Sequence, residues 1–163
     1  MDYFPNDQAA SYFLSEIFPN LKVSNRSWKM YVVGRSPSQA LLNCASNDIV
    51  ITGTVPSIEK YLNEADIVVA PLLSGAGLKN KVLEGMASGK AVIGSSIAFE
   101  GIDGEEGVHF LCANSKSEWI ESINNLANDD DLREAVGRKG REFVRNQFYW
   151  SKIIEEFRAV VLD

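Results

Sequence analysis

The sequence predicts an α/β fold, a Rossmann-like doubly wound parallel sheet with helices on both faces, and three observations support this prediction. Five short apolar runs alternate with segments of helical spacing, which is typical of βαβ units. The runs are apolar throughout, as in strands that are buried on both faces. Three more helical stretches follow the last run. We therefore expect one domain over residues 1–163, with ligands bound beyond the carboxyl ends of the strands.

The expected elements follow one another without a linker or an internal repeat. The first helix has apolar residues at helical spacing from Ala9 to Phe18 and is capped by Asn6 or Asp7. The strands are expected at 28–33, 49–52, 67–70, 91–94 and 108–112. The other helices are expected at 36–45, from 56 onward, behind the loop at 74–78, and at 117–128, 130–147 and 150–162. Because an alternating domain usually begins with a strand, either the sheet is one strand short or a strand precedes this polypeptide.

Composition narrows the classes of function. A chain with 45% hydrophobic and 23% charged residues is an ordinary soluble globule, and it has no apolar run near the ~20 residues that span a bilayer. The net charge of −6 argues against general binding of nucleic acid. Cys44 and Cys112 lie in apolar contexts, which favours buried thiols and a cytoplasmic setting. With His109 as the single histidine, metal sites built on several imidazoles are excluded, and we expect no bound metal.

The segment Pro71–Gly89 places a Gly-x-Gly loop between an apolar strand and a helix. The free N–H groups at the start of such a helix attract phosphate. Lys79 and Lys81 lie in the first turns, where the helix dipole disfavours cations. Their presence indicates either that an anion binds at the start of the helix or that this surface is solvated. The pair Gly75 and Gly77 alone could equally be a tight structural turn.

Two other loops are expected at the same edge of the sheet. Gly34-Arg35-Ser36 and Gly53-Thr54-Val55 each follow a strand, as the loop at 74–78 does. A single glycine at a strand end can be no more than a turn residue. Three such loops at one edge, with the lysines, favour a ligand that carries phosphate.

The run from Asp66 to Ser96, with Phe99–Ile102 behind it, closely resembles the group 1, or family 4, glycosyltransferases. The match is to the donor-binding carboxyl-terminal half of their two-domain GT-B architecture. Residues 1–6, 49–55 and 148–151 are similar to further segments of that half, in the expected order. The resemblance implies that residues 1–163 form this half and begin after its first strand.

The resemblance also implies roles for individual residues. Glu84 matches the second glutamate of the family's Glu-x7-Glu motif, which accepts hydrogen bonds from the donor ribose. The first glutamate of the motif holds the donor sugar in the family, but this sequence has Ala76 at that position. Backbone N–H groups would then have to supply the contact with the sugar. Lys79 or Lys81 would stand in for the family's diphosphate-binding cations. The implied donor diphosphate and sugar site is Gly75, Ala76, Gly77, Leu78, Lys79 and Lys81, and the implied base-binding loop is Gly53, Thr54 and Val55.

Together these observations predict the donor-binding domain of a retaining, hexosyltransferase-type glycosyltransferase of polysaccharide biosynthesis. It would transfer a sugar from a nucleoside-diphosphate sugar to a glycan or lipid-linked acceptor, with no other cofactor. The acceptor site would come from the missing amino-terminal domain, as would any contact with the inner face of a membrane, and the isolated domain would be inactive. The sequence assigns no catalytic residue. Alternatives are a nucleotide-sugar epimerase of similar fold, a non-catalytic doubly wound binding module, and a degenerate transferase half.

Overall fold

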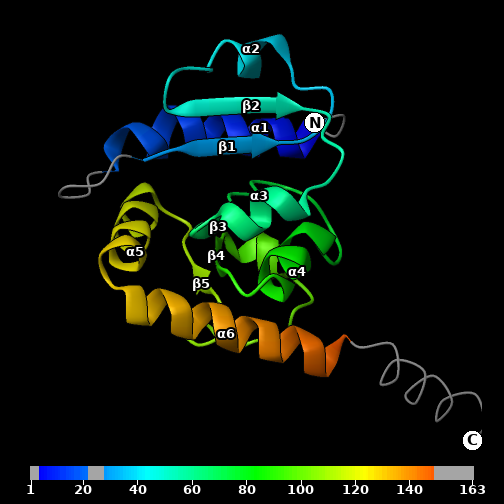
Figure 1. The fold of residues 1–163 in the computed structure, drawn as a ribbon, viewed down its shortest axis with the longest axis vertical. Coiled ribbons are helices and arrows are strands. Elements are labelled where there is room, and N and C mark those ends of the chain that lie inside the picture. The colour runs from blue at the N-terminus through cyan, green and yellow to red at the C-terminus, as the bar shows by residue number, and fades with distance from the viewer. Residues whose placement is uncertain (1–3, 22–27, 149–163) are drawn as a thin grey trace, which may run out of the picture.

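The computed structural model describes residues 4–21 and 28–148, and its strands are parallel with helices packed on both faces (Figure 1). This confirms the predicted α/β class. The described strands are β1 (Met30–Val33), β2 (Ile49–Gly53), β3 (Ile67–Ala70), β4 (Ala91–Gly94) and β5 (Leu111–Cys112). The described α-helices are α1 (Phe4–Tyr12), α2 (Gln39–Leu42), α3 (Glu59–Glu64), α4 (Asn80–Ala87), α5 (Lys116–Asn128) and α6 (Asp130–Gln147).

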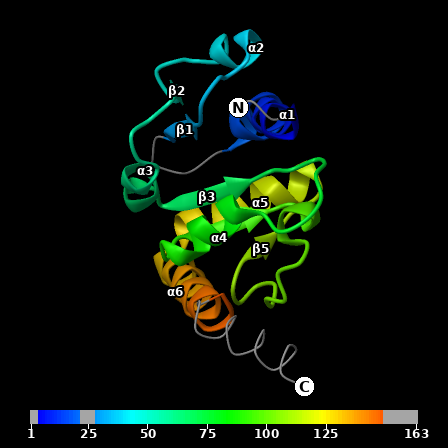
Figure 2. The same ribbon diagram turned by 90° about the vertical axis from the view of Figure 1, so that its right-hand side faces the viewer.

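The expected single sheet is present as two sheets. β1 pairs with β2, with Met30 opposite Ile49, and β3, β4 and β5 form a separate sheet in which Ile67 lies opposite Ala91. β1 and β3 are not hydrogen-bonded neighbours. Figure 2 shows α1 lying beside β1 and over β3, so the first helix joins the two sheets.

The helix α1 continues into a π-helical turn, η1 (Phe13–Ile17), and a 3₁₀ turn, η2 (Phe18–Asn20). The expected helix thus extends over the predicted apolar run but begins at Phe4, before the two residues that were expected to cap it. Asn6 and Asp7 instead reach other parts of the chain, as described below.

The core is built on the two faces of β4. Val92 packs in one apolar cluster with Val82 and Met86 of α4, whereas Ile93 packs in another with Phe13 and Trp119. Because consecutive strand residues point to opposite faces, β4 is covered by α4 on one face and by η1 and α5 on the other. This position at the centre of the core fixes the carboxyl ends of β3 and β4, where the candidate site lies.

The helix α6 begins where the sequence predicts, and α5 begins one residue earlier than predicted. The Ser115 side chain accepts the Glu118 N–H, and Glu118 accepts the Ser115 N–H, which makes a capping box at the start of α5. Asp129 caps α6 by accepting the Leu132 N–H at 2.8 Å. Gly137 allows α6 to lie against the turn after α4, because a Cβ at this position would be 2.3 Å from the Gly89 carbonyl oxygen.

Several expected elements are shorter in the structure. The helix expected at 36–45 is only α2, β1 begins at Met30, and the last strand is only Leu111–Cys112. That strand begins late because the Gly107 N–H donates to the Phe110 carbonyl and closes a turn over the preceding residues. Leu78, the last residue of the expected loop, precedes α4 and is exposed. The helix expected at 150–162 lies outside the described residues.

No helix within residues 4–21 and 28–148 is both long enough and apolar enough to cross a bilayer.

Candidate functional site

A cavity of about 580 Å³ lies between the two sheets. Residues of α1, β1 and β3 supply half of its lining, and the lining is largely apolar. Its polar members are Asn6, Arg35, Thr54 and Lys81. Arg35 is the second residue after β1 and Thr54 is the first after β2, so these residues lie at the carboxyl ends of the strands. The cavity therefore has an apolar interior and a polar rim where ligands of parallel α/β sheets collect.

The glycine loop follows Pro71 and Leu72, which line the cavity, but none of the predicted site residues Gly75, Ala76, Gly77 and Leu78 lines it. Gly75 has φ +126° and Gly77 has φ +74°, backbone conformations that residues with a side chain rarely adopt. The loop leads to α4, whose first position carries no side-chain cap. The first N–H groups of a helix have no acceptor within the helix, so this end of α4 can donate to an anion.

The structure separates the two lysines that the sequence left as alternatives. Lys79 is buried, with 8% of its surface exposed. Its Nζ donates to the Gly77 carbonyl and lies 3.7 Å from Oε2 of Glu100. Lys79 therefore holds the glycine loop against the acidic loop behind β4, where it forms an ion pair with Glu100.

Lys81 instead faces the cavity. It is exposed, lines the cavity, and donates from Nζ to Oδ1 of Asn6. Loss of surrounding water lowers the pKa of Lys81 below its ordinary value, the nearby charge of Lys79 lowers it further, and Glu84 raises it. Lys81 is the lysine whose charge is available to a ligand at the rim.

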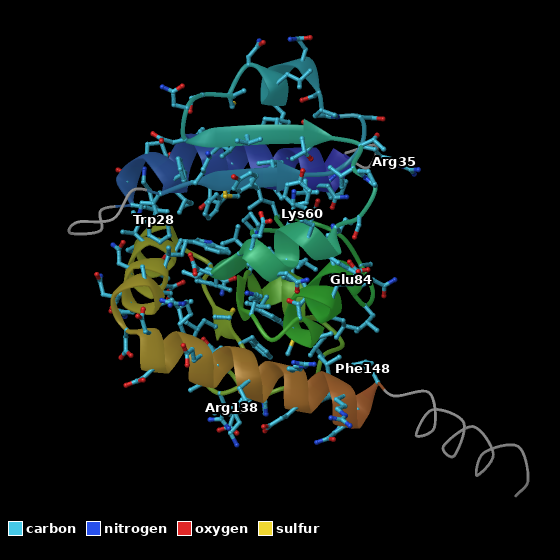
Figure 3. The ribbon with its side chains drawn as sticks, in the orientation of Figure 1. Trp28, Arg35, Lys60, Glu84, Arg138 and Phe148 are labelled. Carbon is cyan, nitrogen blue, oxygen red and sulfur yellow. The ribbon has the colours of Figure 1, made fainter. Side chains whose placement is uncertain are left out.

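Glu84 lies one turn beyond Lys81 on α4 and is exposed. Figure 3 shows Glu84 on the same side of the molecule as Arg35, the side toward which β1 and β2 run. Glu84 does not line the cavity itself. It stands beside the rim, where its carboxylate can accept hydrogen bonds from hydroxyl groups of a ligand.

The loops that follow β1 and β2 complete the rim. Thr54 and Val55 line the cavity, and Gly53 turns the chain with φ +66°. Behind β1, Ser36 adopts φ +50°, which is uncommon for a residue other than glycine. Such a conformation persists where surrounding contacts hold it, often at a functional site.

Two residues of α1 belong to the site although the sequence indicated only helix caps. Asn6 accepts the hydrogen bond from Lys81. Asp7 accepts from the Ser38 N–H at 3.2 Å and from the Ser38 Oγ at 2.9 Å, and Ser38 in turn accepts the Leu41 N–H at 3.1 Å. These contacts anchor the loop behind β1 to the start of α1. A sequence pattern could suggest them only as polar residues at a helix start.

The remaining candidates have structural positions. His109 accepts the Glu105 N–H at Nδ1, at 2.8 Å, and its ring lies 4.8 Å from that of Phe143. Burial, more than the neighbouring carboxylates, raises the pKa of the Cys112 thiol. Within the described ranges, no three His, Cys, Asp or Glu side chains are grouped as a metal site.

Comparison with known proteins bears on this site. A sequence model of the family described as "Glycosyl transferases group 1" matches residues 2–129. The chain belongs to this family. An uncharacterized glycosyltransferase of Methanocaldococcus jannaschii is 31% identical over 126 residues, which is 72% of this chain and 31% of the relative. The chain thus spans about a third of the length of that relative.

Solved structures show the same fold. Anabaena HepE in complex with UDP superposes with a TM-score of 0.76 at 14% identity, over 97% of this chain and 45% of HepE. The carboxyl-terminal domain of the Francisella tularensis group 1 family protein LpcC has a TM-score of 0.66 at 17% identity, over 89% of this chain and 79% of that domain. These likenesses confirm that the chain has the fold of a half of GT-B glycosyltransferases.

Proposed function

We propose that this chain is the donor-binding domain of a retaining glycosyltransferase. It binds a nucleoside-diphosphate sugar at the polar rim, and the full protein transfers the sugar to a glycan or lipid-linked acceptor. One observation carries this proposal: Lys81, in the first turn of the uncapped helix α4, lines the same cavity as Thr54 and Val55. That HepE has been solved with UDP supports a nucleotide ligand for this fold.

The chemistry of sugar transfer suits the groups at the rim. Breaking the bond between the sugar and the diphosphate develops negative charge on the leaving diphosphate. Lys81 and the N–H groups at the start of α4 stabilise this charge more in the transition state than in the ground state. Lys79 supports the reaction indirectly, because its bonds to Gly77 and Glu100 hold the loop that presents these N–H groups.

Glu84 is proposed to bind the donor ribose. Its carboxylate is an acceptor that can take hydrogen bonds from two ribose hydroxyls, and it lies one turn of α4 from the proposed diphosphate cation. Ala76 is exposed in the loop and offers no carboxylate to the donor sugar. The N–H groups of Ala76, Gly77 and Leu78 would contact the sugar instead.

The rest of the reaction requires more protein than this chain. The chain spans 31% of the archaeal relative and 45% of HepE. We propose that the acceptor site and the remaining catalytic groups belong to the other half of a GT-B enzyme. The isolated domain is then expected to bind nucleotide without transferring sugar.

Calorimetric titration of the 163-residue protein with UDP, GDP and ADP tests the proposal. At least one nucleotide is expected to bind, and Lys81→Met is expected to weaken that binding about 10- to 100-fold, as for the loss of a charge-assisted hydrogen bond. The matched control is Lys116→Met, because Lys116 is also exposed and lies in α5, where it pairs with Glu16. No binding of any of the three nucleotides at millimolar concentration, or equal effects of the two substitutions, would contradict the proposed site.

The role of Glu84 has its own test. The preferred nucleotide and its 2′-deoxy form are titrated into the wild-type protein and into Glu84→Ala. The wild type is expected to prefer the ribonucleotide, and the substitution is expected to abolish most of that preference. An undiminished preference in Glu84→Ala would remove the ribose role.

A further inference from the structure

The loop that joins β3 to α4, residues 73–78, is attached at both ends to one short turn behind β4. This is the 3₁₀ turn η3 (Ser96–Phe99), with Ser95 directly before it and Glu100 directly after it. We call residues 95–100 the η3 segment. Its first residue contacts the start of the loop and its last residue contacts the end, so that one segment determines where the loop leaves β3 and where it enters α4.

Ser95 holds the start of the loop with its hydroxyl group. Its Oγ donates to the Leu72 carbonyl at 2.6 Å, and its backbone N–H donates to the Ala70 carbonyl at 3.2 Å. The Leu72 N–H donates to the same Ala70 carbonyl at 2.9 Å, which makes a tight turn at the end of β3. Both Ser95 and Leu72 are buried, so loss of the hydroxyl would deprive a buried carbonyl of a donor that water cannot easily replace.

Ser95 stands at a position where serine usually caps a helical turn. In such a cap the serine oxygen accepts an N–H of the turn that follows. Ser95 makes no side-chain cap of η3, because its hydroxyl is directed to Leu72 instead. The hydroxyl group therefore serves the loop behind β3 and not the turn that it precedes.

Glu100 holds the end of the loop through Lys79. Its Oε2 lies 3.7 Å from Nζ of Lys79, and the same Nζ donates to the Gly77 carbonyl. The Lys79 side chain is only 9% exposed, so its ammonium group relies on acceptors within the protein. Lys79 directly precedes α4 and lies two residues before Lys81, which lines the cavity. The ion pair thus fixes the point at which the chain enters α4.

The η3 segment is itself fixed to the core. Ala98 and Phe99 are buried. A Cβ at Gly94 would lie 2.8 Å from the Ala98 Cβ, so glycine at the end of β4 lets the turn pack directly on the strand. Ser96 donates from its N–H and from its hydroxyl to Oδ1 of Asn114, at 2.9 and 3.0 Å. The loop is therefore attached to a part of the protein that packing and hydrogen bonds hold in place.

We propose that Ser95 and Glu100 are positioning residues for the donor site. They hold the two ends of the loop 73–78 and so set the position of Lys81 and of the first N–H groups of α4 relative to β3. Both act through the loop, because neither lines the cavity itself. The inference rests on the proposed function, in which Lys81 and these N–H groups bind the diphosphate. Donors that are already in position bind an anion without the cost of ordering them.

The first test needs no nucleotide. Order parameters of the backbone N–H groups are measured by NMR relaxation in the wild type, in Ser95→Ala and in Glu100→Gln. The wild-type loop is expected to have values of about 0.85, as in rigid backbone. Ser95→Ala is expected to lower the value of Leu73 below about 0.6, and Glu100→Gln is expected to do the same at Gly77.

Two control variants make the same chemical changes elsewhere. Ser88→Ala removes a hydroxyl that donates to the Gly85 carbonyl at 2.6 Å, the length of the serine bond to the loop, at the far end of α4. Glu105→Gln removes one negative charge from an exposed position behind the η3 segment. Both controls are expected to leave the order parameters of the loop unchanged. A loop that stays ordered in either test variant, or that is already disordered in the wild type, would overturn the proposal.

A second measurement separates positioning from a general loss of stability. The wild type, Ser95→Ala and Ser88→Ala are titrated with whichever of UDP, GDP and ADP the wild type binds most tightly, and with the monophosphate of the same nucleoside. In Ser95→Ala the affinity for the diphosphate is expected to fall about 3- to 10-fold, as for the loss of one hydrogen bond, and the affinity for the monophosphate is expected to fall less. Ser88→Ala is expected to keep the wild-type preference for the diphosphate.

The possible outcomes distinguish this inference from the proposed function. Equal losses for the diphosphate and the monophosphate, or equal losses in Ser95→Ala and Ser88→Ala, would overturn the positioning role and leave the nucleotide site in place. No binding of any of the three nucleotides to the wild type would instead refute the proposed function, and the relaxation measurements would still decide whether Ser95 and Glu100 hold the loop. If Ser95→Ala does not fold, Glu100→Gln provides the same comparison, because the Glu100 side chain is 62% exposed.

Discussion

Gly77→Ala is a direct test of whether the backbone conformation of the glycine loop serves ligand binding. Gly77 has φ +74°, and a Cβ built on it meets no atom within 4 Å. The substitution therefore introduces backbone strain without a steric clash. Gly107 offers a matched control, because it has φ +80°, is equally open, and lies in the loop before β5, away from the cavity lining.

The expected change in the free energy of unfolding is the difference between two terms. Holding an alanine in the left-handed conformation costs roughly 1–2 kcal/mol. The smaller conformational freedom of the unfolded chain returns about 0.4–1 kcal/mol of this. A substitution that leaves the loop in the left-handed conformation, as expected for Gly107→Ala, should then lower the free energy of unfolding by about 1 kcal/mol, which corresponds to about 2–4 °C in Tm for a protein of this size.

The two variants should differ in nucleotide binding. In Gly77→Ala the unliganded loop is released from the left-handed conformation, so this variant should lose less stability than Gly107→Ala. The nucleotide must restore the conformation at the cost of about 1 kcal/mol, which weakens binding about fivefold. Gly107→Ala should bind nucleotide as the wild type does. Thermal unfolding and calorimetric titration of both proteins provide the comparison. Equal nucleotide affinities for the two variants would refute a role of the loop conformation in binding.

Three further outcomes are expected. Gly137→Ala should lower Tm, because its Cβ would lie 2.3 Å from the Gly89 carbonyl oxygen. This clash outweighs the helix propensity of alanine, which exceeds that of glycine by about 1 kcal/mol. A higher Tm would contradict this packing. Backbone hydrogen bonds from Asn114, and to a lesser degree Ser115, hold the pKa of Glu118 below its usual 4.5. The ionised carboxylate therefore stabilises the fold at pH values above 4.5, and this contribution is lost as the pH falls through the lowered pKa. Glu118→Gln should therefore be less stable than the wild type near neutral pH, with a difference that shrinks in acid; a pH-independent difference in chemical unfolding would contradict this. Nucleotide affinity should fall as pH rises through the lowered pKa of Lys81, below the 10.5 of an ordinary lysine, and titrations at several pH values that show no such fall would exclude its charge from binding.

Much of the fold could be predicted because its signals are local. The apolar run 67–70 and the glycine-ended run 91–94 are strands with the predicted bounds, and α5 and α6 begin beside acidic and serine caps that the sequence displays. Short elements were less predictable. The helix expected at 36–45 is reduced to α2, and the strand expected from Val108 begins at Leu111, because loop hydrogen bonds compete with regular structure there.

The candidate site was predicted in part for the same reason. The left-handed conformations of Gly75 and Gly77 follow from the residue type, and the position of Lys81 follows from the helix behind them. The sequence could not distinguish the roles of the two lysines. That distinction depends on Glu100, which is 21 positions from Lys79 in the chain and 3.7 Å from it in the structure.

The sequence by itself determined the order of strands and helices, the glycine loop before α4 and the family to which the chain belongs, because periodicity, backbone freedom and motif spacing are properties of neighbouring residues. Only the tertiary structure decided that Asn6 meets Lys81 across 75 positions and that the sheet divides between β1 and β3. Contacts between distant residues depend on how helices and sheets pack, and this packing has no period in the sequence. The cavity is such a feature, since it is lined by β1 and β3, which are separated by β2 and two helices in the chain.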